Sequence, residues 1–93
     1  PTWRARLETA LERSKRYPGA ALARGHQGVV HVTFVIDRAG ALVASRITHS
    51  SGHPLLDGEA LALLARAQPF PSPPQDLRGD RISIAVPIRF NLR

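Results

Sequence analysis

The segment from Ile82 to Leu92 constrains the fold more than any other part of the chain, because it alternates strictly between apolar and other residues. The apolar set occupies the even positions Ile82, Ile84, Val86, Ile88, Phe90 and Leu92. A period of two predicts a β-strand that buries one face. Pro87 lies in the middle of this strand and cannot donate to a hydrogen-bonded ladder. The segment is therefore predicted to be an edge strand or to be bulged at Pro87.

Two more strands are predicted upstream, joined by a short turn. Residues 28–37 alternate in the same way, with an apolar face made of Val30, Val32, Phe34 and Ile36. Residues 41–50 form the second strand, in which Leu42 and Ile47 are the expected inward residues. Since these two have opposite parity, we expect a β-bulge between them, near residues 44–45.

Three other segments carry helical patterns. Residues 2–16 present one apolar stripe, and residues 18–22 form a short helical turn with Pro18 as its first residue. Residues 54–67 carry the stripe Leu56, Ala60, Leu63, Leu64 and Ala67. This register places Arg66 on the exposed face. The order helix, strand, strand, helix, strand indicates an α+β fold. The predicted core contains Phe34, Ile36, Leu63, Leu64, Ile84, Val86 and Phe90.

Composition excludes several classes of protein. The 93 residues suffice for one domain with a modest core, and 43% hydrophobic and 22% charged residues exclude wholesale disorder. Without cysteine, the chain has neither disulfides nor thiolate metal ligands. No apolar run reaches the length of a membrane span. The net charge of +6 suits an acidic partner or an anionic surface. Because the chain begins at Pro1 without Met, we expect it to be part of a longer protein.

No pattern in the sequence predicts catalysis or a cofactor. None of the four histidines has a carboxylate at a ligand-like spacing, so no metal site is expected. His31 and His49 come together only if the hairpin register allows it. Ser50 and Ser51 precede a helix start at Pro54, which is typical of capping rather than of a hydrolytic triad. We therefore expect a protein that is not an enzyme.

The open edge of the last strand is the candidate binding site. Backbone groups of successive residues point to alternate sides of a strand. Pro87 has no N–H, so its side is predicted to face the open edge rather than the neighbouring strand. The residues of the same parity are Ser83, Ala85, Arg89 and Asn91. An extended peptide would bond to their backbone groups by β-strand addition.

Six motifs in chain order resemble one known family. They are Tyr17-Pro18-x-x-Ala21, the run from Gly25 to Gly40, Ile47-x-x-Ser50-Ser51-Gly52, Leu56-Asp57-x-x-Ala60-Leu61, Ala67-x-Pro69-Phe70-Pro71-x-Pro73-Pro74 and Ile84-x-Val86-Pro87-Ile88-x-Phe90. The sequence is similar to the C-terminal domain of TonB, a periplasmic energy transducer of Gram-negative bacteria. The resemblance implies two helices on one face of a three-stranded antiparallel sheet. It also implies one domain over residues 1–93, in which residues 1–16 form the N-terminal helix and residues 17–93 carry the family pattern.

The resemblance further implies a function and its partners. Such a domain binds the TonB box of outer-membrane transporters and transmits force from the ExbB–ExbD proton motor, in the uptake of siderophore-bound iron, haem, vitamin B12 or similar compounds. It has no cofactor and no catalytic residues. The full protein would lie in the periplasm, anchored in the inner membrane by a helix before Pro1. Secondary contacts to the transporter are expected from Ser14, Lys15, Arg16, Tyr17 and Arg81. In some members, a glutamine that contacts the receptor stands at the Ser14–Arg16 segment.

Two alternatives to this function stay open at the level of sequence. One is a TolA-like periplasmic adaptor that uses the same architecture for other partners. The other is a basic nucleic-acid-binding module, although few aromatic side chains are free for stacking on bases, and no nucleic-acid partner is expected. The sequence also leaves open a homodimer formed by strand exchange at the open edge.

Overall fold

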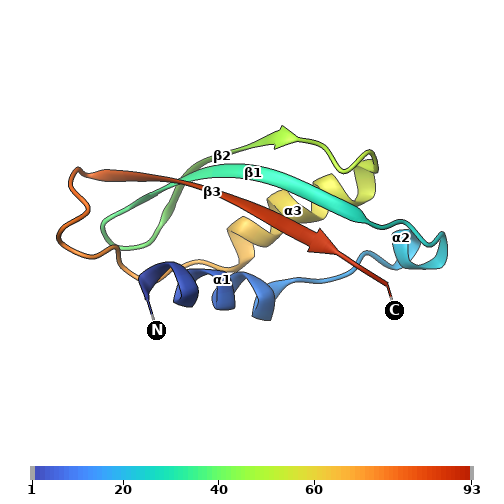
Figure 1. Cartoon of the computed structure of the whole chain (residues 1–93), viewed down its shortest axis with the longest axis horizontal. Helices are drawn as coiled ribbons and strands as arrows, with labels where there is room; N and C mark the ends of the chain where they lie inside the picture. Colours follow the sequence, from blue (N-terminus) through green and yellow to red (C-terminus); the bar gives the residue numbers. More distant parts are fainter. Residues whose placement is uncertain (1, 93) are drawn as a thin grey trace.

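The structure is a computed structural model that describes residues 2–92. Its elements in chain order are α1 (Trp3–Ser14), α2 (Gly19–Ala23), β1 (Gly28–Asp37), β2 (Leu42–His49), α3 (Pro54–Arg66) and β3 (Arg81–Phe90). Helices α1 and α3 lie on the same side of one antiparallel sheet, and the short α2 lies near the end at which β1 begins (Figure 1). The predicted α+β fold, with two helices on one face of a three-stranded sheet, is confirmed, with α2 as a third helix of five residues.

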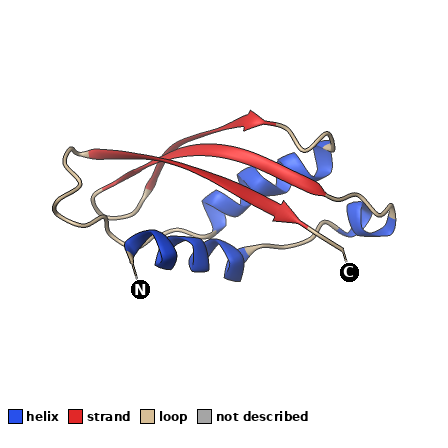
Figure 2. Cartoon of the chain, in the orientation of Figure 1, coloured by secondary structure: helices blue, strands red, loops and turns tan. Residues whose placement is uncertain are grey.

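The strand order is β2-β1-β3, so β3 is an edge strand as predicted (Figure 2). Its pairing with β1 runs without a register shift from Gly28 opposite Phe90 to Asp37 opposite Arg81. Pro87 is therefore accommodated by its position at the edge and not by a bulge. The strand ends at Phe90, before the end at Leu92 that the alternation predicted.

Strand β2 contains two irregularities rather than one. The register with β1 shifts between Val35 and Ile36, where Val43 is the extra residue, and again between His31 and Val32. The predicted bulge between Leu42 and Ile47 is confirmed, and its extra residue is next to the expected residues 44–45. The parity argument itself holds, because the extra residue lets both Leu42 and Ile47 pack partly buried against the core.

The helices begin and end for local reasons. Thr2 caps α1, since its Oγ1 accepts a hydrogen bond from the backbone N–H of Ala5 at 3.1 Å. Helix α1 ends at Ser14, before the end at residue 16 that the sequence predicted. Helix α3 starts with Pro54 in its first turn, where a missing N–H is tolerated.

One core joins the sheet to α1 and α3. All seven predicted core residues are buried, together with Leu7 and Leu11 of α1 and Phe70 of the proline-rich connector. Gly40 shows how closely the connector approaches the hairpin. It has φ +87°, and a Cβ atom there would collide with the carbonyl group of Phe70. Only glycine fits at this position.

Candidate functional site

The outer edge of β3 presents backbone carbonyls that do not bond to β1. The carbonyl oxygen of Ala85 accepts a hydrogen bond from Nη2 of Arg4 at 2.6 Å, and that of Arg89 accepts one from Nζ of Lys15 at 2.7 Å. Both donors belong to the α1 region, which runs beside β3 in Figure 1. The bonding of β1 is consistent with this arrangement. His31 is the partner of Pro87 in the ladder, and its carbonyl oxygen accepts a hydrogen bond from the hydroxyl of Thr48 in β2. Alternation of this kind is what antiparallel pairing requires.

The five residues predicted at this edge do not all lie in the strand. Ser83, Ala85, Pro87 and Arg89 are exposed residues of β3. Asn91 lies beyond the last residue of the strand, and the neighbouring Leu92 donates its N–H to the side chain of Gln27 at 2.7 Å. The ladder with β1 ends at Phe90, so Asn91 lies one residue beyond the paired edge, and its contact with a partner stays a prediction.

A groove runs between α1 and the outer edge of β3. Its volume is about 320 Å³, and its walls are Glu8, Leu11, Glu12 and Lys15 on one side and residues 86–89 on the other, with Leu63 below. The floor is apolar and the α1 wall is charged. A groove along an open strand edge is suited to an extended segment, whose backbone bonds to the edge while alternate side chains enter the groove.

Helix α1 is fixed in place by contacts at both of its ends. The indole N–H of Trp3 donates to the carbonyl of Pro71 at 2.8 Å. At the other end, the ring of Tyr17 meets Phe90 edge-on, with centroids 5.6 Å apart. The hydroxyl of Tyr17 also donates to the carbonyl of His26. These contacts, with the buried Leu7, hold the outer wall of the groove to the fold.

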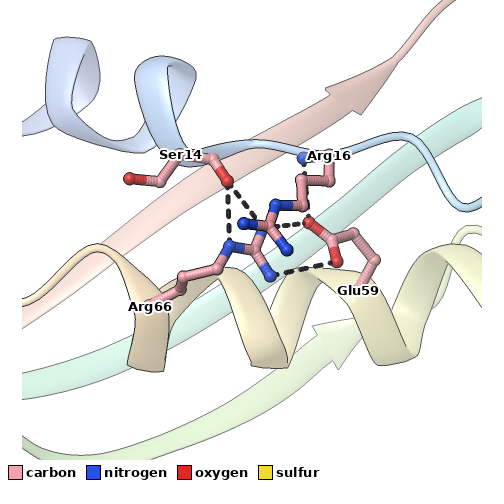
Figure 3. A network of polar contacts seen from close by, with 4 residues as sticks. All are labelled: Ser14, Arg16, Glu59 and Arg66. Carbon is pink, nitrogen blue, oxygen red and sulfur yellow. Dashed lines mark hydrogen bonds and ion pairs between the residues drawn. The ribbon is translucent and has the colours of Figure 1, made fainter.

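A polar network ties the segment after α1 to helix α3 (Figure 3). The guanidinium of Arg66 donates to the carbonyl of Ser14 at 2.6 and 3.1 Å and pairs with the carboxylate of Glu59. The same carboxylate accepts the backbone N–H of Arg16 at 3.0 Å. The prediction that Arg66 lies on an exposed face is wrong, since only 26% of its side chain is accessible. The sequence showed the helix period but not the neighbouring segment that covers this face.

The other predicted contact residues divide between structural and exposed positions. Ser14 and Arg16 use backbone groups in this network, and Lys15 bonds to the β3 edge. Tyr17 is partly buried against the core. Arg81 is the exposed first residue of β3, opposite Asp37. Arg81 thus belongs to the edge strand itself, and of the other four residues the structure brings Lys15 directly to this edge.

The Ser50–Ser51 loop is joined to α3 through Asp57, but the expected capping by these serines is not found, because the N-cap residue is His53 and no side chain caps this helix. The carboxylate of Asp57 accepts hydrogen bonds from the Ser50 hydroxyl and from both the hydroxyl and the N–H of Ser51, the latter two at 2.8 and 3.0 Å. Burial acts to raise the pKa of Asp57, but these hydrogen bonds outweigh it and hold the pKa below its ordinary value. The acceptor is therefore a carboxylate at neutral pH, which stabilises the start of α3.

The histidines form two ring pairs. His31 and His49 are cross-strand partners with ring centroids 5.6 Å apart. His26 and His53 stack at 4.2 Å, a contact between distant loops that sequence reasoning missed. Burial lowers the pKa of His26, and the nearby His53 and Arg24 lower it further. Within residues 2–92, no group of three or more potential ligands is placed to hold a metal ion.

Comparison with known proteins assigns the chain to a family. The model of the Gram-negative bacterial TonB protein C-terminal region matches residues 13–92. The chain belongs to the TonB C-terminal domain family. Members of this family are non-enzymatic transducer and binding domains. In the described residues, no helix has the length and apolar character that crossing a membrane requires.

Relatives of the TonB family share both sequence and fold with this chain. TonB of Pseudomonas putida is 34% identical over 93 residues, which cover 99% of this chain and 38% of that protein. TonB of Pasteurella multocida (strain Pm70) is 34% identical over 90 residues, covering 97% and 34%. The chain thus spans little more than a third of these relatives.

Two solved structures superpose on the chain. The solution structure of a Helicobacter pylori TonB C-terminal domain aligns with a TM-score of 0.81 and 27% identity, covering 98% of this chain and 81% of that one. The structure of the HasB C-terminal domain aligns with a TM-score of 0.65 and 43% identity, covering 100% and 72%. The TonB C-terminal fold therefore extends over the described chain.

Proposed function

We propose that this chain binds the TonB box of outer-membrane transporters by β-strand addition to the outer edge of β3. The observation that carries the proposal is the direction of the Ala85 and Arg89 carbonyls, which point away from β1 and accept bonds from other groups. Their alternation with the inward-paired residues leaves a backbone template along the edge. An added strand would satisfy these groups through its own N–H and C=O.

Backbone pairing suits a domain that serves more than one transporter. Main-chain hydrogen bonds supply affinity while reading little side-chain identity. Selectivity would come from side chains that enter the groove between α1 and β3, whose lining includes the apolar Leu11 and Val86. Such a site recognises an extended segment with alternating small or apolar side chains.

Strand addition also suits the transmission of force. A strand pulled along its length loads several hydrogen bonds together, whereas a strand peeled from one end loads them one after another. We infer that the full protein, held in the inner membrane and driven by ExbB and ExbD, pulls on the transporter through this pairing. In this role, the protein would act in the periplasm in the uptake of siderophore-bound iron, haem, vitamin B12 or similar compounds.

The test is a structural mapping of a bound peptide. A peptide that contains the TonB box of a transporter would be titrated into isotope-labelled protein, with a scrambled peptide as the control. We expect the largest amide shifts at β3 and cross-strand contacts from the peptide to Ala85 and Arg89. Shifts confined to β2 or to the His26–His53 loops would refute this assignment of the site.

A further inference from the structure

Two basic side chains of the α1 region already occupy the acceptors that an incoming strand needs. Arg4 near the start of α1 bonds to the carbonyl of Ala85, and Lys15 just after its end bonds to the carbonyl of Arg89. The two bonds come from opposite ends of the helix, and Lys15 and Arg89 also line the groove. We call the oxygens of Ala85 and Arg89 the edge carbonyls.

We propose that Arg4 and Lys15 are intramolecular competitors that hold the edge carbonyls until an incoming strand replaces them. For the transporter peptide, this inference rests on the proposed function and concerns its regulation. The same competition applies to any strand, including β3 of a second copy. Arg4 and Lys15 therefore protect the open edge from non-specific pairing with other strands. Other sheets prevent such edge-to-edge aggregation with charged residues, proline or covering segments.

The geometry makes this competition hard to avoid. Added strands bond to alternate residues of an edge, so an incoming segment meets Ala85, Pro87 and Arg89 in turn. Pro87 offers a carbonyl but no N–H. Ala85 and Arg89 are thus the two positions around Pro87 at which an added strand can both donate and accept. Arg4 and Lys15 occupy the acceptor at each of these two positions.

Release of the side chains does not require α1 to leave the fold. Nε of Arg4 lies 3.5 Å from the carboxylate of Glu8, and Nζ of Lys15 lies 3.0 Å from that of Glu12. Arg4 and Lys15 therefore each keep a carboxylate partner after they release the edge carbonyls. The body of α1 stays anchored by the buried Leu7. The side chains can swing away while the helix remains as the outer wall of the groove.

The experiment compares Arg4→Met, Lys15→Met and the double variant with Arg6→Met and Arg13→Met. Methionine keeps much of the alkyl stem and removes the donor. Arg6 and Arg13 are exposed on the same helix, and among residues 2–92 neither bonds to β3, so they control for the lost charge. The affinity of a labelled TonB-box peptide would be measured for each variant, with thermal unfolding to verify the fold.

We expect each single variant to bind the peptide about three- to tenfold more tightly than the wild type, because one competing bond is removed. The double variant should gain more than either single one. Lys15→Arg, which restores a donor, should return toward the wild-type affinity. If Arg4→Met and Lys15→Met bind no more tightly than their controls, the competition does not exist.

A second readout separates this inference from the proposed function. Loss of the Lys15 bond should move the carbonyl ¹³C resonance of Arg89 upfield without peptide, and Arg13→Met should leave it in place. If that resonance does not respond, the contact is absent in solution and the inference is overturned. If it responds but no TonB-box peptide binds to any variant, the proposed function fails. In that case, the inference stands only if the double variant self-associates in sedimentation experiments more strongly than Arg6→Met.

Discussion

Pro87 of β3 lies directly opposite His31 of β1, in a ladder that continues without a shift on both sides of the pair. Since Pro87 cannot donate, its neighbours in the chain must make the bonds to β1. This places the residues of even number on the β1 side and Ala85 and Arg89 on the open side. The pairing of Pro87 with His31 therefore decides which backbone groups of β3 face the open edge.

Replacing single amides by esters tests this division. An ester at Ala85 or Arg89 removes an outward N–H and should weaken binding of a TonB-box peptide by about 0.5–1.5 kcal/mol each. An ester at Ile84 or Val86 removes a bond to β1 and should mainly lower the free energy of unfolding. The measurements are peptide titration and chemical denaturation of semisynthetic protein. Affinity lost at the even positions alone would invert the assignment.

The packing of α3 predicts a large difference between two leucines. Leu64 is fully buried, so Leu64→Ala should lower the free energy of unfolding by about 2–5 kcal/mol. Leu61 is 36% exposed, and the same substitution there should cost less than half as much. Denaturant titration compares the two. Equal losses would show that the register of the helix against the sheet is different.

Arg66 should contribute to the stability of the fold, although the sequence pattern of α3 places it outside the apolar stripe. Arg66→Met removes the partner of Glu59 and both bonds to the Ser14 carbonyl, and should cost about 1–3 kcal/mol. Arg13→Met, on an exposed face, should change the free energy of unfolding by less than about 0.5 kcal/mol. In a double-mutant cycle, Glu59→Gln should cost little once Arg66 is gone. Additive losses would contradict the network.

The basic surface near the edge predicts a salt dependence of binding. Arg78, Arg81 and Arg89 are exposed around β3 and should speed the encounter with a peptide that has acidic flanks. Raising the salt concentration from low to physiological should lower the association rate much more than it raises the dissociation rate. Stopped-flow mixing separates the two rates. An association rate that does not change with salt would exclude steering by these arginines.

The His26–His53 stack predicts a loss of stability in mild acid. The pKa of His26 lies below the value of 6.5 that holds in the unfolded chain, so between these two pKa values the unfolded state binds more protons. The free energy of unfolding should therefore fall as the pH drops from neutral through this window. Burial is the main cause of the lowered pKa of His26, and His53 adds to it, so His53→Gln should flatten the slope in part. A stability that rises as the solution is acidified through this window would contradict this sign.

Asp57 provides the internal control for this pH dependence, because it titrates in a separate, lower window. Its pKa is depressed, so the stability that its carboxylate contributes is present above the unfolded value of 3.8 and is lost as the pH falls through the folded value. Asp57→Asn should remove this acid-dependent part while leaving the His26 slope in place. Unfolding curves recorded from neutral to strongly acidic pH report both steps.

The alternation of apolar residues determined much of the fold. It placed β1 at residues 28–37, limited β3 to an edge position or a bulge because of Pro87, and selected Phe34 and Ile84 among others for the core, while the helical period selected Leu64. Period and parity are local properties, and they follow from which side chains can avoid water on a strand or a helix. The TonB-like motifs indicated the family for the same reason, since their residues stand in the sequence itself.

Only the tertiary structure decided what surrounds the edge of β3. Arg4, Lys15 and Arg66 have the sequence pattern of solvated charges, yet all three bond to backbone carbonyls distant in the chain. The stack of His26 on His53 has no sequence signal either. Such contacts depend on how α1 and the loops lie against the sheet, which is set by the packing of the whole core and leaves no periodic trace in the sequence. The pattern of residues thus determined the strand and its open side, while the packing of α1 decided which groups occupy that side.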